Sequence, residues 1–78
     1  MDPITTRLTA CFQTVFPDLP PARIPHASQT SVPKWDSTAA IMLLNVIEDE
    51  FEIQIDFDLL AELDSFDRFH EYLSMAGQ

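Results

Sequence analysis

Several residue types are scarce in this 78-residue chain, and each scarcity excludes a class of protein. The single cysteine, Cys11, cannot form an internal disulfide, which excludes a disulfide-stapled secreted scaffold. The single glycine excludes the glycine-rich loops that cradle phosphate groups. The longest uninterrupted apolar stretch, residues 39–44, is far shorter than the roughly 20 residues of a membrane-spanning helix. We therefore expect no membrane insertion and, because residues 1–3 lack the character of a signal peptide, a cytoplasmic location.

Basic residues are also few, since four Lys and Arg stand against thirteen Asp and Glu, for a net charge of -9. Such a chain is repelled by nucleic-acid backbones and by anionic lipid surfaces, so neither is an expected partner. At 46% hydrophobic residues it is nevertheless too apolar to be a disordered acidic tail. Residues 1–35 carry a net charge of +1 and residues 36–78 carry -10. In a domain this small, the asymmetry predicts one strongly negative face that suits basic protein partners.

Hydrophobic periodicity places the chain in the all-α class, because apolar residues recur at the three- and four-residue intervals of a helical stripe. The predicted architecture is one domain over residues 1–78, a small four-helix bundle with a long first loop and a short third helix. The predicted helices cover approximately residues 3–16, 37–51, 57–63 and 65–76. The residues expected in the core stripes are Ile4, Leu8, Cys11, Phe12 and Val15; Ala40, Leu43, Leu44, Ile47 and Phe51; Leu59, Leu60 and Leu63; and Phe66, Phe69, Tyr72 or Leu73, and Ala76.

Capping residues set the starts of these predicted helices. Asp2 is the expected N-cap of the first helix, with Pro3 at its first position, where the missing N–H costs nothing. Asp36 or Ser37 is expected to cap the second helix, and Asp56 the third. Local hydrogen bonding thus predicts three of the boundaries.

The connection after the first helix is long and rich in proline. Five prolines lie within residues 17–33, and their ring geometry predicts that no regular element forms there. A connection of this length is uncommon in a compact domain unless it is functional or packed against the core, and we expect Leu19, Ile24 and Val32 to pin it. Residues 52–56 alternate as a strand would, but without an apparent partner strand they are predicted to be a loop.

One motif stands at the start of the predicted second helix. The pair Asp36-Ser37 immediately precedes that helix, whose last turn is the acidic run at residues 48–50 followed by Phe51. In this combination the chain resembles the acyl carrier protein family. The resemblance covers the element order of the whole chain and is continuous from the Asp-Ser pair through the predicted fourth helix.

The resemblance implies a prosthetic group, a cargo and partners. Ser37 would receive phosphopantetheine, derived from coenzyme A, from a phosphopantetheinyl transferase, and Asp36 would help that enzyme hold its metal and align the serine. The protein would be a monomer and not itself an enzyme. It would hold acyl intermediates as thioesters and deliver them to partner enzymes of fatty-acid, polyketide or another specialised biosynthesis.

Physical chemistry supports a modified serine at this position without settling it. A hydroxyl at a helix N-terminus lies among unpaired backbone N–H groups and the positive end of the helix dipole, which favours an attached phosphodiester. The alternative is that Asp36 and Ser37 only cap the helix, because both residue types are common at helix starts for local reasons.

A partner-binding surface is predicted along the second helix, where basic patches of partner enzymes would dock. Its acidic residues have an ordinary solvated face as the alternative reading, and its apolar residues could instead pack under the long loop. Departures from the family pattern are Thr38 for the usual leucine, Met42 for a commonly acidic residue, and Trp35 for a small one, which together predict a rewritten surface. The candidate partner-binding residues are Asp36, Thr38, Ile41, Met42, Glu48, Asp49 and Glu52.

A second hypothesis from another class is a non-enzymatic acidic helical adaptor that binds a basic protein partner and never carries an arm. Enzymatic and metal-binding hypotheses have less support. Cys11 is expected to be a small core residue rather than a nucleophile paired with His26 or His70, and His70 is expected to be a partly buried structural residue. The acidic residues between 56 and 62 lack the spacing and central glycine of a calcium loop, so no metal is expected.

Overall fold

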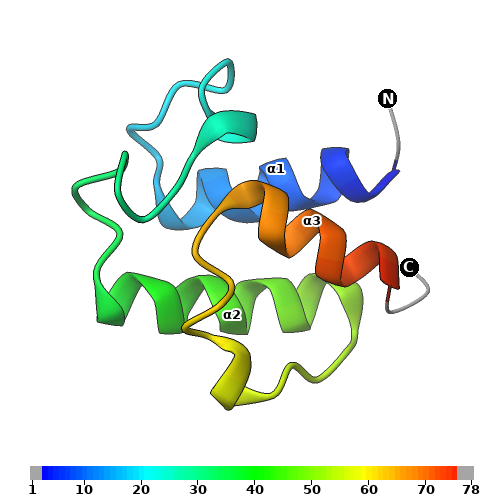
Figure 1. The fold of residues 1–78 in the computed structure, drawn as a ribbon. Helices are drawn as coiled ribbons and strands as arrows, with labels where there is room; N and C mark the ends of the chain where they lie inside the picture. Colours follow the sequence, from blue (N-terminus) through cyan, green and yellow to red (C-terminus); the bar gives the residue numbers. More distant parts are fainter. Residues whose placement is uncertain (1–2, 76–78) are drawn as a thin grey trace.

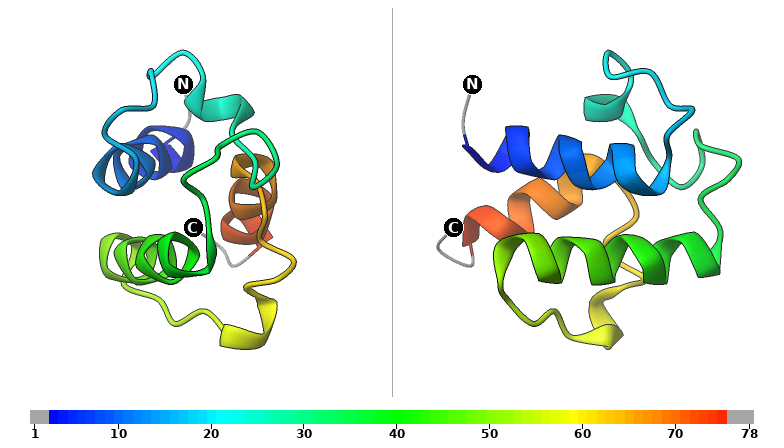
Figure 2. Two further views of the ribbon diagram at one scale, coloured as in Figure 1. Left: turned by 90° about the vertical axis from the view of Figure 1, so that its left-hand side faces the viewer. Right: turned by 180° about the vertical axis from the view of Figure 1, so that it is seen from behind.

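The computed structural model describes residues 3–75, which form α-helices and 3₁₀ turns without any strand in that part of the chain. The two long helices, α1 and α2, run in opposite directions, and the shorter α3 lies across their side (Figure 1). Helix α1 packs against α2, and α3 packs against α1 and the 3₁₀ turn η1; this arrangement is clearest along the helix axes (Figure 2). The elements are α1 Pro3–Val15, η1 Ile24–His26, α2 Ser37–Phe51, η2 Phe57–Leu59 and α3 Phe66–Met75.

The all-α class is confirmed, but the prediction of four helices is wrong. Where a helix over residues 57–63 was expected, the chain forms only the 3₁₀ turn η2 and a further turn. Asp56 does cap this segment, since its side chain accepts the N–H of Asp58. A single turn fixes several backbone torsions for very few hydrogen bonds, so a segment this short does not propagate into an α-helix.

The proline-rich connection is more regular than predicted. Residues Ile24–His26 form η1, although the five prolines were expected to exclude any regular element. The turn forms because its hydrogen bonds are donated by His26 and Ala27, neither of which is a proline, while Pro25 occupies the first turn, where no N–H is needed. The predicted pinning is confirmed: Ile24 and Val32 are buried and Leu19 is half-buried against the core.

Periodicity predicted the core of α2 correctly, because its five expected core residues are the five that are buried. The stripe of α1 is buried at its centre and half-buried at Ile4 and Val15. Leu63 is buried as expected and Leu59 and Leu60 are half-buried, and α3 buries Leu73 rather than Tyr72. The predictions for Asp2 and Ala76 lie outside the described residues. No charged or polar residue is fully buried within residues 3–75.

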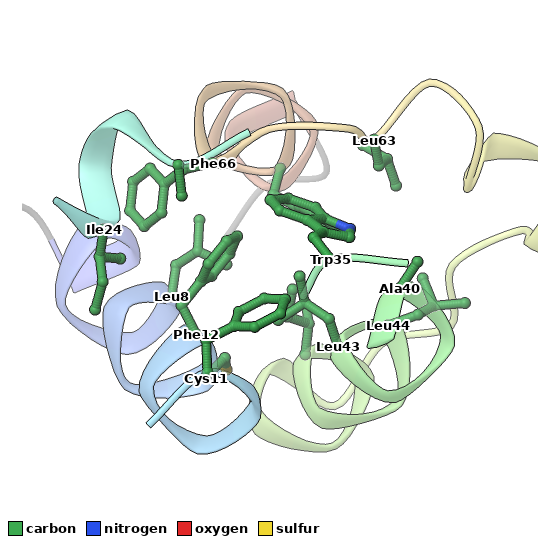
Figure 3. Packing of buried hydrophobic residues seen from close by; sticks show 14 of the residues in the cluster. Leu8, Cys11, Phe12, Ile24, Trp35, Ala40, Leu43, Leu44, Leu63 and Phe66 are labelled. Atoms are coloured by element: carbon green, nitrogen blue, oxygen red, sulfur yellow. The ribbon is translucent and has the colours of Figure 1, made fainter. Parts of the chain in front are cut away.

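Trp35 occupies the middle of an aromatic cluster and corrects one prediction. Its ring lies 5.5 Å from that of Phe12 and 5.7 Å from that of Phe16, measured between ring centroids. Phe12 and Trp35 point into the same interior as Leu43 and Phe66 (Figure 3). With only 3% of its surface exposed, Trp35 is a core residue and not part of a rewritten surface. Because it directly precedes Asp36, its packing anchors the start of α2.

Two backbone hydrogen bonds attach the proline-rich connection to the start of α3. The N–H of Gln29 donates to the carbonyl of Asp64 at 2.8 Å, and the N–H of Phe66 donates to the carbonyl of Ala27 at 2.9 Å. Ser28 and Ser65 face each other between these bonds as an isolated bridge. These bonds hold residues 27–29 of the connection against the start of α3. The connection therefore delivers the chain to α2 in a fixed position.

Candidate functional site

Ser37 is the first residue of α2, and the neighbouring Asp36 is its N-cap. Asp36 has an extended backbone, and its Oδ1 accepts the N–H of Ala39 at 2.9 Å. The sequence left open which of the two residues caps the helix, and the structure assigns that role to Asp36. The Ser37 side chain is exposed and makes no hydrogen bond to another residue within 3–75. Its hydroxyl is thus accessible to another protein.

The backbone around Ser37 favours negative charge. The first N–H groups of a helix have no acceptor within that helix, and the aligned peptide dipoles leave a partial positive charge there. The 15-residue α2 has no acidic residue in its first turn, although the Asp36 carboxylate just before it offsets part of that charge. A phosphate-linked group on the Ser37 oxygen would lie at the end of the helix that stabilises it.

A pocket of about 360 Å³ opens beside Ser37, between the first half of α2 and the segment that contains η2. This is the segment that projects below α2 in Figure 1. Phe57 is conspicuous in its wall, because 62% of its surface is exposed although it is a large apolar residue. Sequence analysis missed this pocket, and only the unpaired apolar residues near positions 41 and 57 could have signalled it. Its lining residues are Gln29, Ser37, Ala40, Ile41, Phe57, Asp58, Leu60 and Ala61.

The apolar residues predicted on the outer face of α2 are exposed. Ile41 and Met42 expose 39% and 52% of their surfaces, and Thr38 is also exposed. Ile41 additionally lines the pocket beside Ser37, whereas Met42 does not. The first half of α2 therefore presents a small apolar surface directly next to the candidate serine.

The acidic residues predicted for docking lie at the opposite end of α2 and do not form one uniform surface. About 18 Å of helix separates Ser37 from Asp49, at 1.5 Å per residue. Asp49 and Glu52 are exposed, but Glu48 is half-buried, and its Oε2 accepts the N–H of Ile55 at 2.7 Å. This bond ties the chain after α2 back onto the helix, so Glu48 has a structural role beside any role in docking.

Glu50 is also engaged within the protein. Its Oε2 lies 2.9 Å from the Nε of Arg7 on α1, and its carbonyl oxygen accepts a second hydrogen bond from the same guanidinium. That guanidinium also lies over the Phe51 ring, 4.4 Å from its centroid. Of the four carboxylates within residues 48–52, those of Asp49 and Glu52 are the most available to a partner.

The remaining titratable candidates form no alternative site. Cys11 is 2% exposed, and burial, together with the negative charge of Glu50, raises the pKa of its thiol to about 11. Its expected role as a core residue is confirmed, and His70 is half-buried as expected. Within the described residues, no three His, Cys, Asp or Glu side chains gather where they could hold a metal ion. None of the helices described has the length and apolar character needed to cross a bilayer.

The chain matches no protein-family model, no curated protein and no solved structure.

Proposed function

We propose that Ser37 carries a phosphopantetheine arm and that the protein holds acyl groups on it as thioesters for partner enzymes of fatty-acid, polyketide or another specialised biosynthesis. One observation carries the proposal: the Ser37 hydroxyl is exposed at the N-terminus of α2 and unused, because Asp36 performs the capping. With Asp36 as the cap, no hydrogen bond of the fold needs the Ser37 side chain, so its hydroxyl is available for modification.

The elements around Ser37 suit an attached arm. The buried Trp35 fixes the chain on one side of the serine, and α2 continues on the other, so the attachment point is rigid while the arm itself is free. The pocket beside Ser37 has mainly apolar walls and accommodates part of the arm or its cargo. On this proposal η2 takes the place of the short third helix of acyl carrier proteins.

Modification of Ser37 is tested directly by mass spectrometry. The full chain is incubated with coenzyme A, magnesium and a promiscuous phosphopantetheinyl transferase, and its intact mass is expected to rise by that of one arm. Ser37→Ala is expected to abolish the gain, and Ser74→Ala, which changes an exposed serine of α3, is expected to leave it unchanged. No gain from a transferase that modifies a reference carrier in the same tube would overturn the proposal.

Asp36 is a second point of test, because its charge can be removed while its cap is kept. Asparagine is as good an N-cap as aspartate, so Asp36→Asn is expected to fold normally. If Asp36 helps the transferase hold its metal, the variant is expected to gain the arm more slowly than the unchanged protein. An unchanged rate would confine Asp36 to its capping role.

The adaptor hypothesis remains a second candidate, favoured by the exposed Met42 and Asp49. An adaptor that never carries an arm is expected to function normally as Ser37→Ala in the cell that encodes it, and to lose function as Asp49→Lys. Asp49 is the better residue for this test, because replacing Glu48 would also release the N–H of Ile55. A carrier would show the opposite dependence on Ser37.

A further inference from the structure

The proline-rich connection contains a second pocket, of about 340 Å³, that shares no lining residue with the pocket beside Ser37. Its apolar walls are formed by the half-buried Leu19 and the buried Ala27 and Val32. Its polar residues are Arg23, His26 and Ser31, of which the first two carry basic side chains. A carrier that uses only Ser37 has no need of this pocket.

Arg23 and His26 face the same way because of the turn that separates them. Arg23 is the N-cap of η1 and His26 is its last residue, a spacing of three. In a 3₁₀ turn, side chains three residues apart are eclipsed, so the guanidinium and the imidazole lie on one outer face. Ile24, between them, is fully buried and holds the turn against the core.

The two basic side chains have no anionic partner within residues 3–75. Arg7 is paired with Glu50, and Lys34 with Asp18, but neither Arg23 nor His26 takes part in an ion pair or side-chain hydrogen bond there. Asp18 is the acidic residue next to the pocket in sequence, and its Oδ2 lies 2.8 Å from the Lys34 Nζ. The pocket lies within residues 1–35, which carry a net charge of +1, so the unpaired Arg23 attracts an anion there although the chain as a whole is acidic.

The backbone holds this pocket in shape before anything binds. The N–H of Arg23 donates to the carbonyl of Pro20 at 2.9 Å, and that of His26 donates to the carbonyl of Arg23 at 3.0 Å. On the other wall, the N–H of Val32 donates to the carbonyl of Ser28 at 2.9 Å. Proline further limits the freedom of the connection, and a rigid site loses less entropy when a ligand binds.

We propose that this pocket binds a small organic monocarboxylate with a short apolar tail. The planar guanidinium of Arg23 matches a carboxylate, with His26 beside it, and the tail would lie against Leu19 and Val32. A phosphate dianion fits less well, because the overall negative charge of the protein opposes a doubly charged ligand and the walls are largely apolar. The inference goes beyond the proposed function and does not require an arm on Ser37.

The test is an NMR titration of the isotope-labelled full chain carrying Ser37→Ala, which keeps the result independent of the arm. Hexanoate, acetate and hexylammonium are added at constant ionic strength. Hexanoate is expected to shift the amides of residues 19–32 saturably and to bind more tightly than acetate, while hexylammonium leaves them unchanged. Arg23→Gln is expected to weaken hexanoate binding about tenfold or more, the loss typical of a charge-assisted hydrogen bond. Arg68→Gln is the matched control, because it changes an exposed arginine of α3 whose own pocket also contains Glu62 and Glu71, which oppose a carboxylate.

Any of four results would overturn the inference. Hexanoate could bind Arg23→Gln as tightly as it binds the unchanged chain. It could shift the amide signals of the pocket beside Ser37 instead of those of residues 19–32. Acetate could bind as tightly as hexanoate, which would show a general anion effect. A titration in which hexanoate causes no saturable shift in residues 19–32 would likewise exclude the site. Arg23 is exposed, so the variant is expected to keep its fold, and unchanged amide signals in α2 and α3 would establish this.

Discussion

Glu52 has an unfavourable backbone conformation, since it is the one non-glycine residue within 3–75 with a positive φ. At φ 55° and ψ 46° it ends α2, and its N–H and that of Ile53 both donate to the carbonyl of Glu48. A side chain in this left-handed region costs roughly 1 kcal/mol, and glycine avoids the cost. We expect Glu52→Gly to raise the free energy of unfolding by about 0.5 to 1 kcal/mol, measured by urea denaturation.

The matched control for this prediction is Glu52→Ala. It removes the same carboxylate but keeps a Cβ in the left-handed region, so it separates backbone strain from charge. Glu52→Ala is expected to give little of the stabilisation that Glu52→Gly gives. If the alanine and glycine variants are equally stable, the stabilisation comes from lost charge repulsion and the strain argument is wrong.

Cys11 makes the free energy of unfolding depend on pH in the alkaline range. Burial and the nearby Glu50 raise the pKa of the thiol from its ordinary 9.0 to about 11 in the folded protein. Between these values the unfolded chain has released the proton while the folded chain retains it, so the stability present below pH 9 is lost as pH rises. We expect Cys11 to contribute a loss of about 2 kcal/mol over this interval.

The measurement is urea denaturation at pH 8 and at about pH 10.5, for the unchanged chain and for Cys11→Ala. Alanine leaves a small cavity and lowers stability at both pH values. The informative quantity is therefore the slope, the change in the free energy of unfolding between the two pH values. The slope is expected to be shallower in the variant, because other groups that ionise in this range are common to both proteins. Equal slopes would show that the thiol does not titrate as its burial implies.

At the scale of elements, the quality of each prediction followed the length of its periodic signal. Helix α2 was predicted with its full set of buried residues, because fifteen residues without glycine or proline give the pattern several turns to repeat. The segment after Asp56 offered a single turn of pattern, and it became η2 rather than a helix. Helix propensity over so few residues is outweighed by the cost of nucleation.

The candidate site was predicted in part for a similar reason. The exposure of Ser37 follows from local rules for helix starts, which a sequence displays directly. The two pockets and the burial of Trp35 depend instead on contacts between distant segments, such as Gln29 with Asp64, and these leave no periodic trace. The hydrogen bond from Ile55 to Glu48 is of the same kind, and it gives an acidic residue that was predicted for docking a structural role as well.

That hydrogen bond yields a prediction about how α2 is joined to the following segment. Glu48→Ala leaves the N–H of the buried Ile55 without its charged acceptor and is expected to lower the free energy of unfolding by about 1 to 2 kcal/mol. Glu48→Gln keeps an acceptor and is expected to lose less. Asp49→Ala, at an exposed neighbour, is expected to stay within about 0.5 kcal/mol of the unchanged chain.

The readouts are urea denaturation and hydrogen exchange at the Ile55 amide, which is expected to exchange faster in Glu48→Ala. If Asp49→Ala proves as destabilising as Glu48→Ala, the effect belongs to helix propensity or charge and not to this hydrogen bond. The comparison also shows how much of any docking defect in a Glu48 variant comes from a loosened helix end.

At the scale of the whole molecule, we expect charge repulsion to outweigh charge pairing. A net charge of -9 is confined to a body of 29 by 29 by 17 Å. The described residues contain two ion pairs, both of them on the surface, where such pairs contribute little. The acidic run near residue 49 also lies at the C-terminal end of α2, where the helix dipole disfavours carboxylates. Screening should therefore stabilise this fold.

The magnitude of screening makes this prediction specific. The Debye length is about 30 Å at 0.01 M salt and about 8 Å at 0.15 M, so the carboxylates repel each other across the whole molecule only at the lower concentration. We expect the free energy of unfolding to rise with sodium chloride over this range, measured by urea denaturation. Asp49→Asn is expected to be more stable at low salt and less sensitive to salt than Gln13→Lys, which makes the same change of one charge on the exposed face of α1. A fall in stability with added salt would mean that the two ion pairs matter more than the repulsion, and equal behaviour of the two variants would mean that total charge, and not its concentration in residues 36–78, governs the effect.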